Sequence, residues 1–316
     1  MCSGAQELAP PLELEALRQR YKALNESFRR TRIQHVGTGA GFCAEAIGLL
    51  KAMLSCLAQE TRLVVSAHPR GRGFGLGAGW DDYFFSPFPT VTGRRYAVLN
   101  RGHYPAHSRL PGPLVEASHS LTRRFLGADL LQFDSVPLPT RIASPALGMD
   151  LDWWSGCKLC LGLMWHMRPE VADEAEGLRR DLGIAGDYTG VHIRRGDKRT
   201  EASYVQIEQY AAAICAAEQA PRTVVVACDD ATAPLRLAAL LGASFHVVAI
   251  SSPDDRGYDQ REFNRLPRDL RRWKTIRFLA EFEALRHSTL AFVTLSSNVG
   301  CLLRYARGNS GLVDVS

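Results

Sequence analysis

The sequence at positions 189–198 reads TGVHIRRGDK. Its first five residues have the small and β-branched composition of a strand that is buried on both faces. Four charged residues follow within the next five positions, so this strand ends at a polar loop. In an open parallel sheet, ligands bind beyond the carboxyl ends of the strands, which makes this loop the first place to look for a site.

Strands and helices alternate through the rest of the second half of the chain. Further strands are predicted at 223–227, 245–250, 290–295 and 312–315, and helices at 204–217, 234–241, 269–286 and 298–307. This alternation predicts a parallel sheet with helices on both faces, that is, a Rossmann-like domain. We place this C-terminal domain at 187–316.

The first half of the chain has a mixed α/β pattern. Three glycines at 37, 39 and 41 mark a turn, an apolar-periodic helix follows to Leu57, and a β-branched strand is predicted at 62–66. We assign 29–186 to an N-terminal α/β domain and 1–28 to a leader with an amphipathic helix. The apolar stripe of that helix fits packing on its own domain or a homodimer contact, and consists of Leu14, Leu17, Tyr21, Leu24 and Phe28.

Composition excludes several classes of protein. Of the 316 residues, 46% are hydrophobic and 22% charged, as is ordinary for a globular protein, and the net charge of +5 is too diffuse to indicate nucleic-acid binding. The pattern contains neither a signal peptide nor an apolar run of the ~20 residues that span a bilayer. We therefore expect a soluble chain, cytoplasmic or otherwise.

The eight cysteines include a CxxC at 157 and 160, whose apolar neighbours favour buried thiols over a metal or redox site.

Three polar clusters follow predicted strands and are expected to share one cleft. Arginine and a helix start rich in hydroxyl groups suit a diphosphate, and carboxylates suit ribose hydroxyls or a base edge. Ion pairs between these loops are the alternative interpretation. No P-loop, GxGxxG, GxSxG or HExxH motif is present, so a P-loop kinase, a common dehydrogenase and the simplest hydrolases are disfavoured. The clusters are Arg194 with Arg195, Asp229 with Asp230, and Ser296 with Ser297 and Asn298.

The segment GVHIRRGDKRTEASY at 190–204 resembles the donor-site motif of the α1,6-fucosyltransferases, which comprise the N-glycan core and rhizobial nodulation enzymes. The residues IEQY at 207–210 lie at the distance expected for that family. Two further segments agree in order with the same family: Trp153-Trp154 with the helix that runs to Arg168-Pro169, and FVTLSSNV at 292–299. The resemblance covers roughly residues 152–307.

This resemblance implies two Rossmann-like lobes of GT-B type, with GDP-fucose bound by the C-terminal lobe. It also implies that Glu201 is the catalytic base, that Asp197 and Lys198 accompany it, and that Glu281 recognises guanine where the family has aspartate. The other donor-binding residues implied are His192, Arg194, Arg195, Tyr210, Asp229, Asp230, Ser296, Ser297 and Asn298.

The predicted function is inverting transfer of fucose from GDP-fucose to a hydroxyl of a glycan, α1,6 to N-acetylglucosamine. The alternatives are a protein O-fucosyltransferase, a transferase for another nucleotide sugar, and a non-catalytic nucleotide-sugar-binding protein. Asp150 and Asp152 form a DxD, but the family resembled uses no metal, so neither a metal nor a cofactor is expected besides the donor substrate. Two departures bear on activity and acceptor: the loop before Glu201 is one residue shorter than in the animal enzymes, and their SH3-like domain has no counterpart here.

Overall fold

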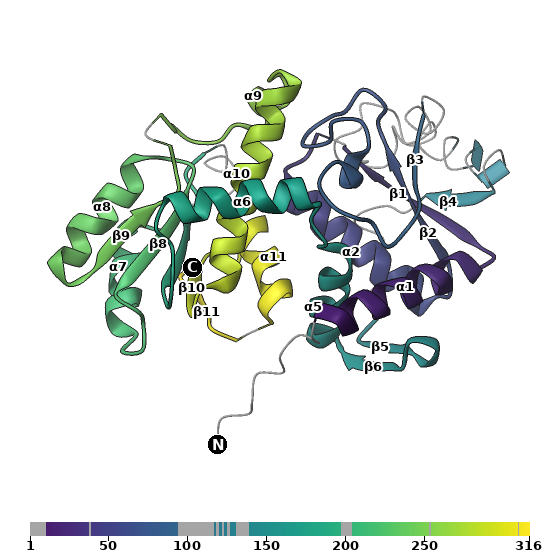
Figure 1. Cartoon of the computed structure of the whole chain (residues 1–316), viewed down its shortest axis with the longest axis horizontal. Helices are drawn as coiled ribbons and strands as arrows, with labels where there is room; N and C mark the ends of the chain where they lie inside the picture. The colour runs from purple at the N-terminus through teal and green to yellow at the C-terminus, as the bar shows by residue number, and fades with distance from the viewer. Residues whose placement is uncertain are drawn as a thin grey trace. The chain divides into compact units, whose positions relative to one another are not determined.

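A computed structural model describes residues 11–37, 39–93, 139–196, 204–252, 254–308 and 310–316, together with several positions between 117 and 130. The chain forms two compact units, of which the first ends at Arg168 and the second begins at Pro169 (Figure 1). Helix α6 (Pro169–Asp181) packs on α10 (Arg268–His287) within the second unit. The domain boundary predicted at 186/187 lies beyond α6.

The first unit contains a parallel sheet of four described strands in the order β3-β2-β1-β4. Helix α2 is apolar around most of its circumference, and it is buried against β1, β2 and α5. Strands β5 and β6 form a separate antiparallel pair. The elements are α1 (Pro11–Ser27), β1 (Thr31–Val36), α2 (Phe42–Ala58), β2 (Arg62–Ala67), η1 (Gly79–Asp82), β3 (Thr90–Thr92), β4 (Ala128–Leu130), β5 (Arg141–Ser144), η3 (Pro145–Leu147), β6 (Met149–Asp152) and α5 (Trp153–Met164).

Helix α1 packs within the first unit rather than leaving its whole stripe exposed. Tyr21 is buried, and the buried amide of Asn25 extends the hydrogen bonding of β2. Its Nδ2 donates to the carbonyl oxygen of Leu63 at 3.0 Å, and its Oδ1 accepts from the Leu63 N–H at 2.7 Å. Asn25 also begins a glycosylation sequon, Asn25-Glu26-Ser27, and both polar atoms of its amide are engaged by Leu63. The homodimer contact through this helix stays a prediction.

The CxxC pair lies in a buried helix, as its apolar neighbours predicted. Cys157 and Cys160 are both buried in α5, and burial raises the pKa of Cys160 to about 12 and that of Cys157 still further. Thiols with raised pKa values are poor nucleophiles and poor metal ligands, since both roles need the thiolate. Within the described residues, no group of three or more histidine, cysteine or acidic side chains is arranged to hold a metal ion.

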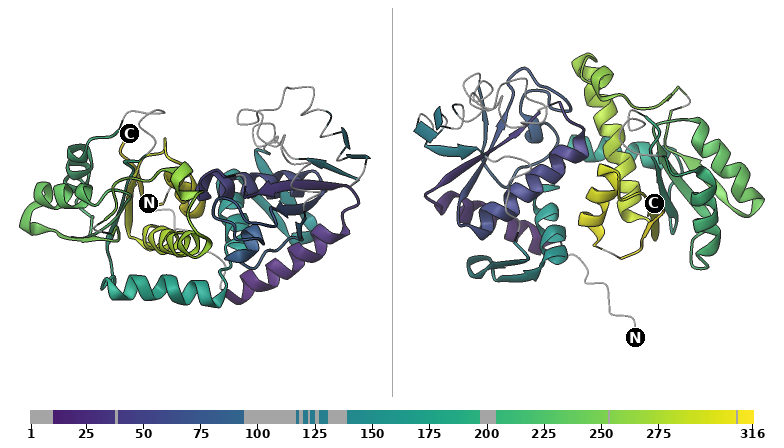
Figure 2. Two further views of the ribbon diagram at one scale, coloured as in Figure 1. Left: turned by 90° about the horizontal axis from the view of Figure 1, so that it is seen from above. Right: turned by 180° about the vertical axis from the view of Figure 1, so that it is seen from behind.

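The second unit is a doubly wound domain with five parallel strands in the order β11-β10-β7-β8-β9. Helices α7 and α8 cover one face, where Val191 and Ile193 of β7 pack on Tyr210 and Leu237. Helices α10 and α11 cover the other face (Figure 2). The elements that follow α6 are β7 (Thr189–Ile193), α7 (Ile207–Ala216), β8 (Thr223–Cys228), α8 (Thr232–Leu241), η5 (Gly242–Ser244), β9 (His246–Ala249), α9 (Gln260–Phe263), α10 (Arg268–His287), β10 (Leu290–Val293), α11 (Asn298–Arg307) and β11 (Leu312–Asp314).

Among the described residues, no helix is both long enough and apolar enough to cross a membrane.

Arg307, the last residue of α11, closes the carboxyl end of α10. Its Nη1 donates to the carbonyl oxygens of Leu285 at 3.0 Å and Ser288 at 2.6 Å, and its Nη2 donates to those of Thr289 at 3.1 Å and Gly311 at 3.2 Å. The carbonyls of Leu285 and Ser288 lie at the end of α10, where a helix leaves its last C=O groups without intrahelical donors. One guanidinium therefore joins the end of α10 to β10 and β11.

Replacing Arg307 with methionine is expected to lower the free energy of unfolding by about 3 kcal/mol, because several carbonyl acceptors, most of them partly buried, lose a charged donor. Urea unfolding followed by circular dichroism would measure this change. The matched control is Arg261→Met in α9, an exposed position, which is expected to stay within about 0.5 kcal/mol of the wild type. Equal effects of the two substitutions would contradict the role assigned to Arg307.

Candidate functional site

The strand order of the second unit reverses between β7 and β10, which lie side by side at its centre. In doubly wound sheets the crevice beyond the carboxyl ends of such a strand pair is where ligands bind. Arg194 follows β7 at this edge, Ser297 follows β10, and Asp229 follows the neighbouring strand β8. The polar clusters that the sequence places after these strands therefore lie along one sheet edge.

Asp229 organises this edge by accepting hydrogen bonds from three segments. Its Oδ2 accepts from Arg194 Nη1 at 2.6 Å, from the Gly196 N–H at 2.9 Å and from the Tyr258 N–H at 3.3 Å. Its Oδ1 accepts from the Arg195 N–H at 2.7 Å. The carboxylate thus ties the loop after β7 and the loop after β9 to the end of β8. From the sequence, this carboxylate was expected to accept hydrogen bonds from ribose hydroxyls. In the structure its oxygens already accept from protein donors.

Gly196 allows two of these loops to touch. A Cβ atom built at Gly196 would lie 2.1 Å from the carbonyl oxygen of Tyr258, closer than real contacts allow. Gly257, on the other side of the contact, has a φ of +101°, in the region that side chains disfavour. The two loop backbones approach so closely at this point that each loop requires a glycine there.

Arg194 is held in one orientation by its neighbours. In addition to its ion pair with Asp229, its guanidinium lies over the Tyr258 ring, 4.9 Å from the centroid. Its side chain is 21% exposed. The ion pair is the alternative that the sequence left open, and it engages Nη1 of the guanidinium. An oriented, partly exposed guanidinium can both hold Asp229 and face an anion.

Arg195 and Tyr204 pack together across the start and end of the same loop. The Arg195 guanidinium lies 5.1 Å from the centroid of the Tyr204 ring. The Tyr204 hydroxyl donates to the carbonyl oxygens of Arg195 and Gly196, the latter at 2.5 Å. Both ends of the loop are therefore fixed. Between them lie Asp197, Lys198 and Glu201, the three predicted catalytic residues, which are outside the described residues.

Helix α11 presents its amino end at the same edge. Ser297 is its N-cap: its Oγ accepts from the Gly300 N–H at 3.0 Å and donates to the Thr294 carbonyl oxygen at 3.1 Å. The Ser297 hydroxyl, which was predicted to contact phosphate, thus caps the helix. The first N–H groups of the helix lack intrahelical acceptors and suit an anion. Ser296 and Asn298, beside the cap, are exposed.

Three other predicted residues have structural surroundings of their own. Asp230 accepts from the Thr232 N–H at 2.8 Å and from its hydroxyl at 2.7 Å; although burial opposes the change, these bonds lower the pKa of Asp230. Tyr210 is buried on the α7 face, and burial raises its pKa to about 12. Burial, together with the charge of Arg194, lowers the pKa of His192 to about 3, so its ring is neutral. Within the described residues, no group bonds to His192 Nδ1.

A second charged group lies on α10 beside the same edge. Arg277 Nη2 donates to Asp255 Oδ2 at 2.5 Å and to the carbonyl oxygen of Ile250 at 3.2 Å. Its Nε lies 3.5 Å from Oε1 of Glu281, one helical turn further along. Burial raises the pKa of Glu281 to about 7, which Arg277 opposes and the nearby charges of Asp255 and Asp229 reinforce. Glu281 therefore changes charge near neutral pH.

This raised pKa makes stability depend on pH. The ordinary pKa of this carboxyl is 4.5, so its contribution to folding is complete below about pH 4.5 and is lost as the pH rises through 7. Relative to a Glu281→Gln variant, the wild type should lose about 3 kcal/mol of unfolding free energy between those pH values. Urea unfolding of both proteins at pH 5 and pH 8 measures the difference. A constant difference between them would contradict the assignment.

The DxD in the first unit is occupied by local interactions. Asp150 pairs with Arg141, whose Nε lies 2.5 Å and Nη2 2.8 Å from its two carboxylate oxygens. Asp152 caps α5 through the N–H groups of Trp154 and Ser155, at 2.9 and 3.1 Å. Both carboxylates thus have structural partners in the β5–β6 pair and the helix that follows it.

Sequence reasoning missed three residues of the candidate site, Tyr258, Asp255 and Arg277. The first two lie in the polar segment at 251–259, which directly follows strand β9. Its position after a strand is the sequence signal that could have identified these two residues. Arg277 carried no comparable signal, because a charged residue in the middle of a helix is ordinary on a solvent face.

No protein-family model and no curated protein matches this chain. Solved structures do match. A NodZ alpha-1,6-fucosyltransferase soaked with GDP-fucose has a TM-score of 0.53 and 14% identity over 88% of this chain and 92% of that one. The fucosyltransferase NodZ from Bradyrhizobium has a TM-score of 0.54 and 14% identity over 91% of this chain and 96% of that one.

POFUT1 in complex with GDP has a TM-score of 0.51 and 11% identity over 90% of this chain and 97% of that one. At such identities the comparisons show a shared fold. The protein therefore has an α/β fold similar to that of two fucosyltransferase structures and of POFUT1.

Proposed function

We propose that this protein transfers fucose from GDP-fucose to a sugar hydroxyl of a glycan, forming an α1,6 linkage to N-acetylglucosamine. The observation that carries the proposal is the switch-point edge, where Arg194 and the start of α11 flank the ends of β7 and β10. A fixed guanidinium and the amino end of a helix both donate hydrogen bonds to anions, and together they suit a diphosphate. The similarity in fold to NodZ supports the same donor class.

The guanine end of the donor is assigned to Glu281. An ionised carboxylate can accept two parallel N–H donors, and guanine presents two adjacent donors at N1 and N2. Glu281 makes a 3.5 Å ion pair with Arg277 through Oε1, and its side chain is 17% exposed. Arg277 in turn is fixed by Asp255. In this proposal the arginine keeps Glu281 oriented toward the base.

Glu201 acts as the general base in the proposed reaction. It removes the proton from the acceptor hydroxyl while the oxygen attacks the anomeric carbon of the fucose. The bond from that carbon to the β-phosphate oxygen breaks, GDP leaves with the electron pair, and the configuration at the carbon inverts. Arg194, Lys198 and the amino end of α11 stabilise the charge that develops on GDP. No metal is required in this scheme, because protein cations take that role.

The first test is GDP release from GDP-fucose with chitin oligomers or N-glycans as acceptors, with and without EDTA. Activity that survives EDTA and yields an α1,6 linkage by product analysis is the expected result. Glu201→Gln should lower kcat by about 10²–10⁴-fold. The control is Glu208→Gln in α7, an exposed carboxylate paired with Arg236, which should leave kcat unchanged.

Failure to bind GDP or GDP-fucose in calorimetry would overturn the donor assignment. Binding without turnover on any glycan would point to a different acceptor, and the similarity in fold to POFUT1 makes a protein hydroxyl the second candidate. Folded protein domains assayed in parallel with the glycans distinguish the two. Binding without turnover on either acceptor class would favour a non-catalytic nucleotide-sugar-binding protein.

A further inference from the structure

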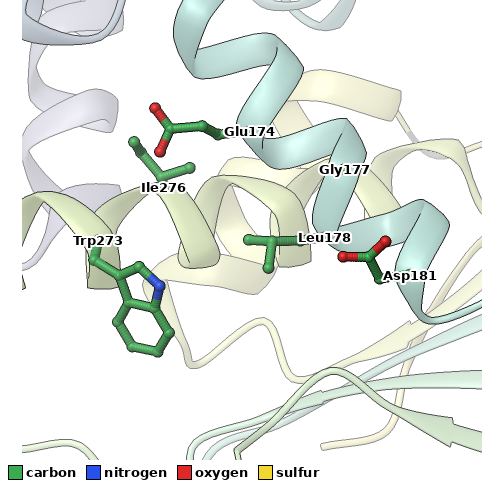
Figure 3. A pocket seen from close by; sticks show the side chains of 6 residues that line it. All are labelled: Glu174, Gly177, Leu178, Asp181, Trp273 and Ile276. Atoms are coloured by element: carbon green, nitrogen blue, oxygen red, sulfur yellow. The ribbon is translucent and has the colours of Figure 1, made fainter.

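A hollow of ≈ 210 Å³ lies between helices α6 and α10 in the second unit (Figure 3). None of its residues belongs to the edge formed by Arg194, Asp229 and α11. Its lining residues differ from those of the donor edge, although Trp273 contacts Arg277, the partner of Glu281. Its lining residues are Glu174, Gly177, Leu178, Asp181, Trp273 and Ile276.

Gly177 is what leaves this hollow open. It lies inside α6, where glycine is less favourable than alanine by roughly 0.5–1 kcal/mol. A Cβ atom built at Gly177 would meet nothing within 4 Å, so neither packing nor backbone conformation requires glycine there. The position that a Cβ atom would take at Gly177 therefore lies in open space beside the hollow. The space above it is accessible to a ligand.

Trp273 provides an aromatic wall. Leu270, Trp273, Ile276 and Leu279 recur at every third position of α10 and form one apolar stripe. Ile276 and Leu279 are buried as such a stripe implies, but Leu270 is 40% and Trp273 45% exposed. The Arg277 guanidinium lies 5.6 Å from the Trp273 ring centroid and helps to hold the indole. Exposed tryptophans beside a hollow are typical anchors of binding sites.

The polar groups of the hollow are carboxylates in two different states. Both oxygens of Glu174 accept from the Arg272 guanidinium, at 2.5 and 2.9 Å, so that carboxylate is fixed. Asp181 is exposed, and none of the described residues donates to it. Asp181 therefore has acceptor capacity for a ligand on the side of the hollow opposite Glu174 (Figure 3).

The charge of the surroundings favours a neutral ligand. Helices α6 and α10 together carry eight acidic and eight basic side chains, so the pair has no net charge, and Arg272 neutralises Glu174. The walls combine an aromatic ring, the aliphatic side chains of Leu178 and Ile276, and an open carboxylate. A pyranose matches this set, because it has a flat face of C–H groups and a rim of hydroxyl donors.

We propose that the hollow between α6 and α10 binds one pyranose residue of a neutral oligosaccharide. The C–H face of the sugar stacks on Trp273, its hydroxyls donate to Asp181, and its remaining edge contacts Leu178 and Ile276. None of its lining residues contacts the donor in the function proposed above, so this inference does not depend on the identity of the donor. In a glycan-modifying enzyme it would hold a part of the glycan that does not react.

Calorimetry of the full chain with chitotetraose, cellotetraose and maltotetraose tests the proposal. At least one of them should bind at concentrations up to about 10 mM. Trp273→Ala should weaken that binding about tenfold, and Gly177→Met should abolish it by filling the hollow. Gly177→Ala is the matched control: it should keep most of the binding and raise stability by roughly 0.5–1 kcal/mol. Circular dichroism verifies that each variant is folded.

The experiment separates this site from the donor site. GDP binding should be unchanged in Gly177→Met and in Asp181→Ala, since neither residue lies at the donor edge. The proposal is overturned if none of the three oligosaccharides binds, or if binding persists in folded Gly177→Met and Trp273→Ala proteins. Binding of a lysine-rich peptide that those variants abolish, in place of the sugars, would also overturn it.

Discussion

Replacing Arg194 with alanine is expected to weaken GDP binding about 100-fold. Asp229 and the Tyr258 ring already fix the guanidinium, so it loses little further conformational entropy when it binds a phosphate. Charge-assisted hydrogen bonds contribute about 1.5–3 kcal/mol each, and one or two of them account for a loss of this size. Isothermal titration of the full chain with GDP measures the effect directly.

The neighbouring arginine offers a matched control. Arg195 has the same charge and lies at the same edge, but its guanidinium packs on Tyr204. Arg195→Ala should therefore weaken GDP binding less than Arg194→Ala does, and Arg194→Lys should fall between wild type and Arg194→Ala because it keeps the charge without the fork. A larger effect at Arg195 than at Arg194 would reverse their roles.

Much of the second unit could be predicted because its signals are local. The strand at Thr189–Ile193 agrees with β7, and the predicted helix at 298–307 agrees with α11. Short β-branched runs that end in polar loops are typical of buried parallel strands. Their order also fixed which residues share an edge, because the carboxyl ends of parallel strands lie together.

The division of roles within the site could not be predicted, since it depends on contacts between distant loops. Asp229 was predicted to face a ligand, but its partners lie in the loops around Gly196 and Tyr258. Ser297 was expected to contact phosphate, and its hydroxyl caps α11 instead. Periodicity likewise indicates a buried stripe on α10, whereas Trp273 on that stripe is 45% exposed.

Asp229→Asn is expected to damage both the fold and the site. Asparagine keeps the shape but replaces one acceptor oxygen with an NH₂ group, which would then face N–H donors of Arg194, Arg195, Gly196 or Tyr258. Removing one partner of a fully buried ion pair typically costs about 3–5 kcal/mol, and this pair is partly exposed, so we expect the lower end of that range. Urea unfolding should show a loss of about 3 kcal/mol, and titration with GDP should show weak or no binding.

Asp230→Asn separates this role from that of a ligand-binding carboxylate. Asp230 is adjacent in sequence, yet its oxygen accepts only from Thr232 in the described structure, at the start of α8. Its substitution should cost no more than about 1 kcal/mol and should leave GDP affinity within a few-fold of the wild type. If Asp229 instead received ribose hydroxyls, Asp229→Asn would lower GDP affinity while leaving the unfolding free energy nearly unchanged. The combination of lost stability and lost binding at Asp229 alone identifies it as the residue that joins the loops and thereby positions Arg194.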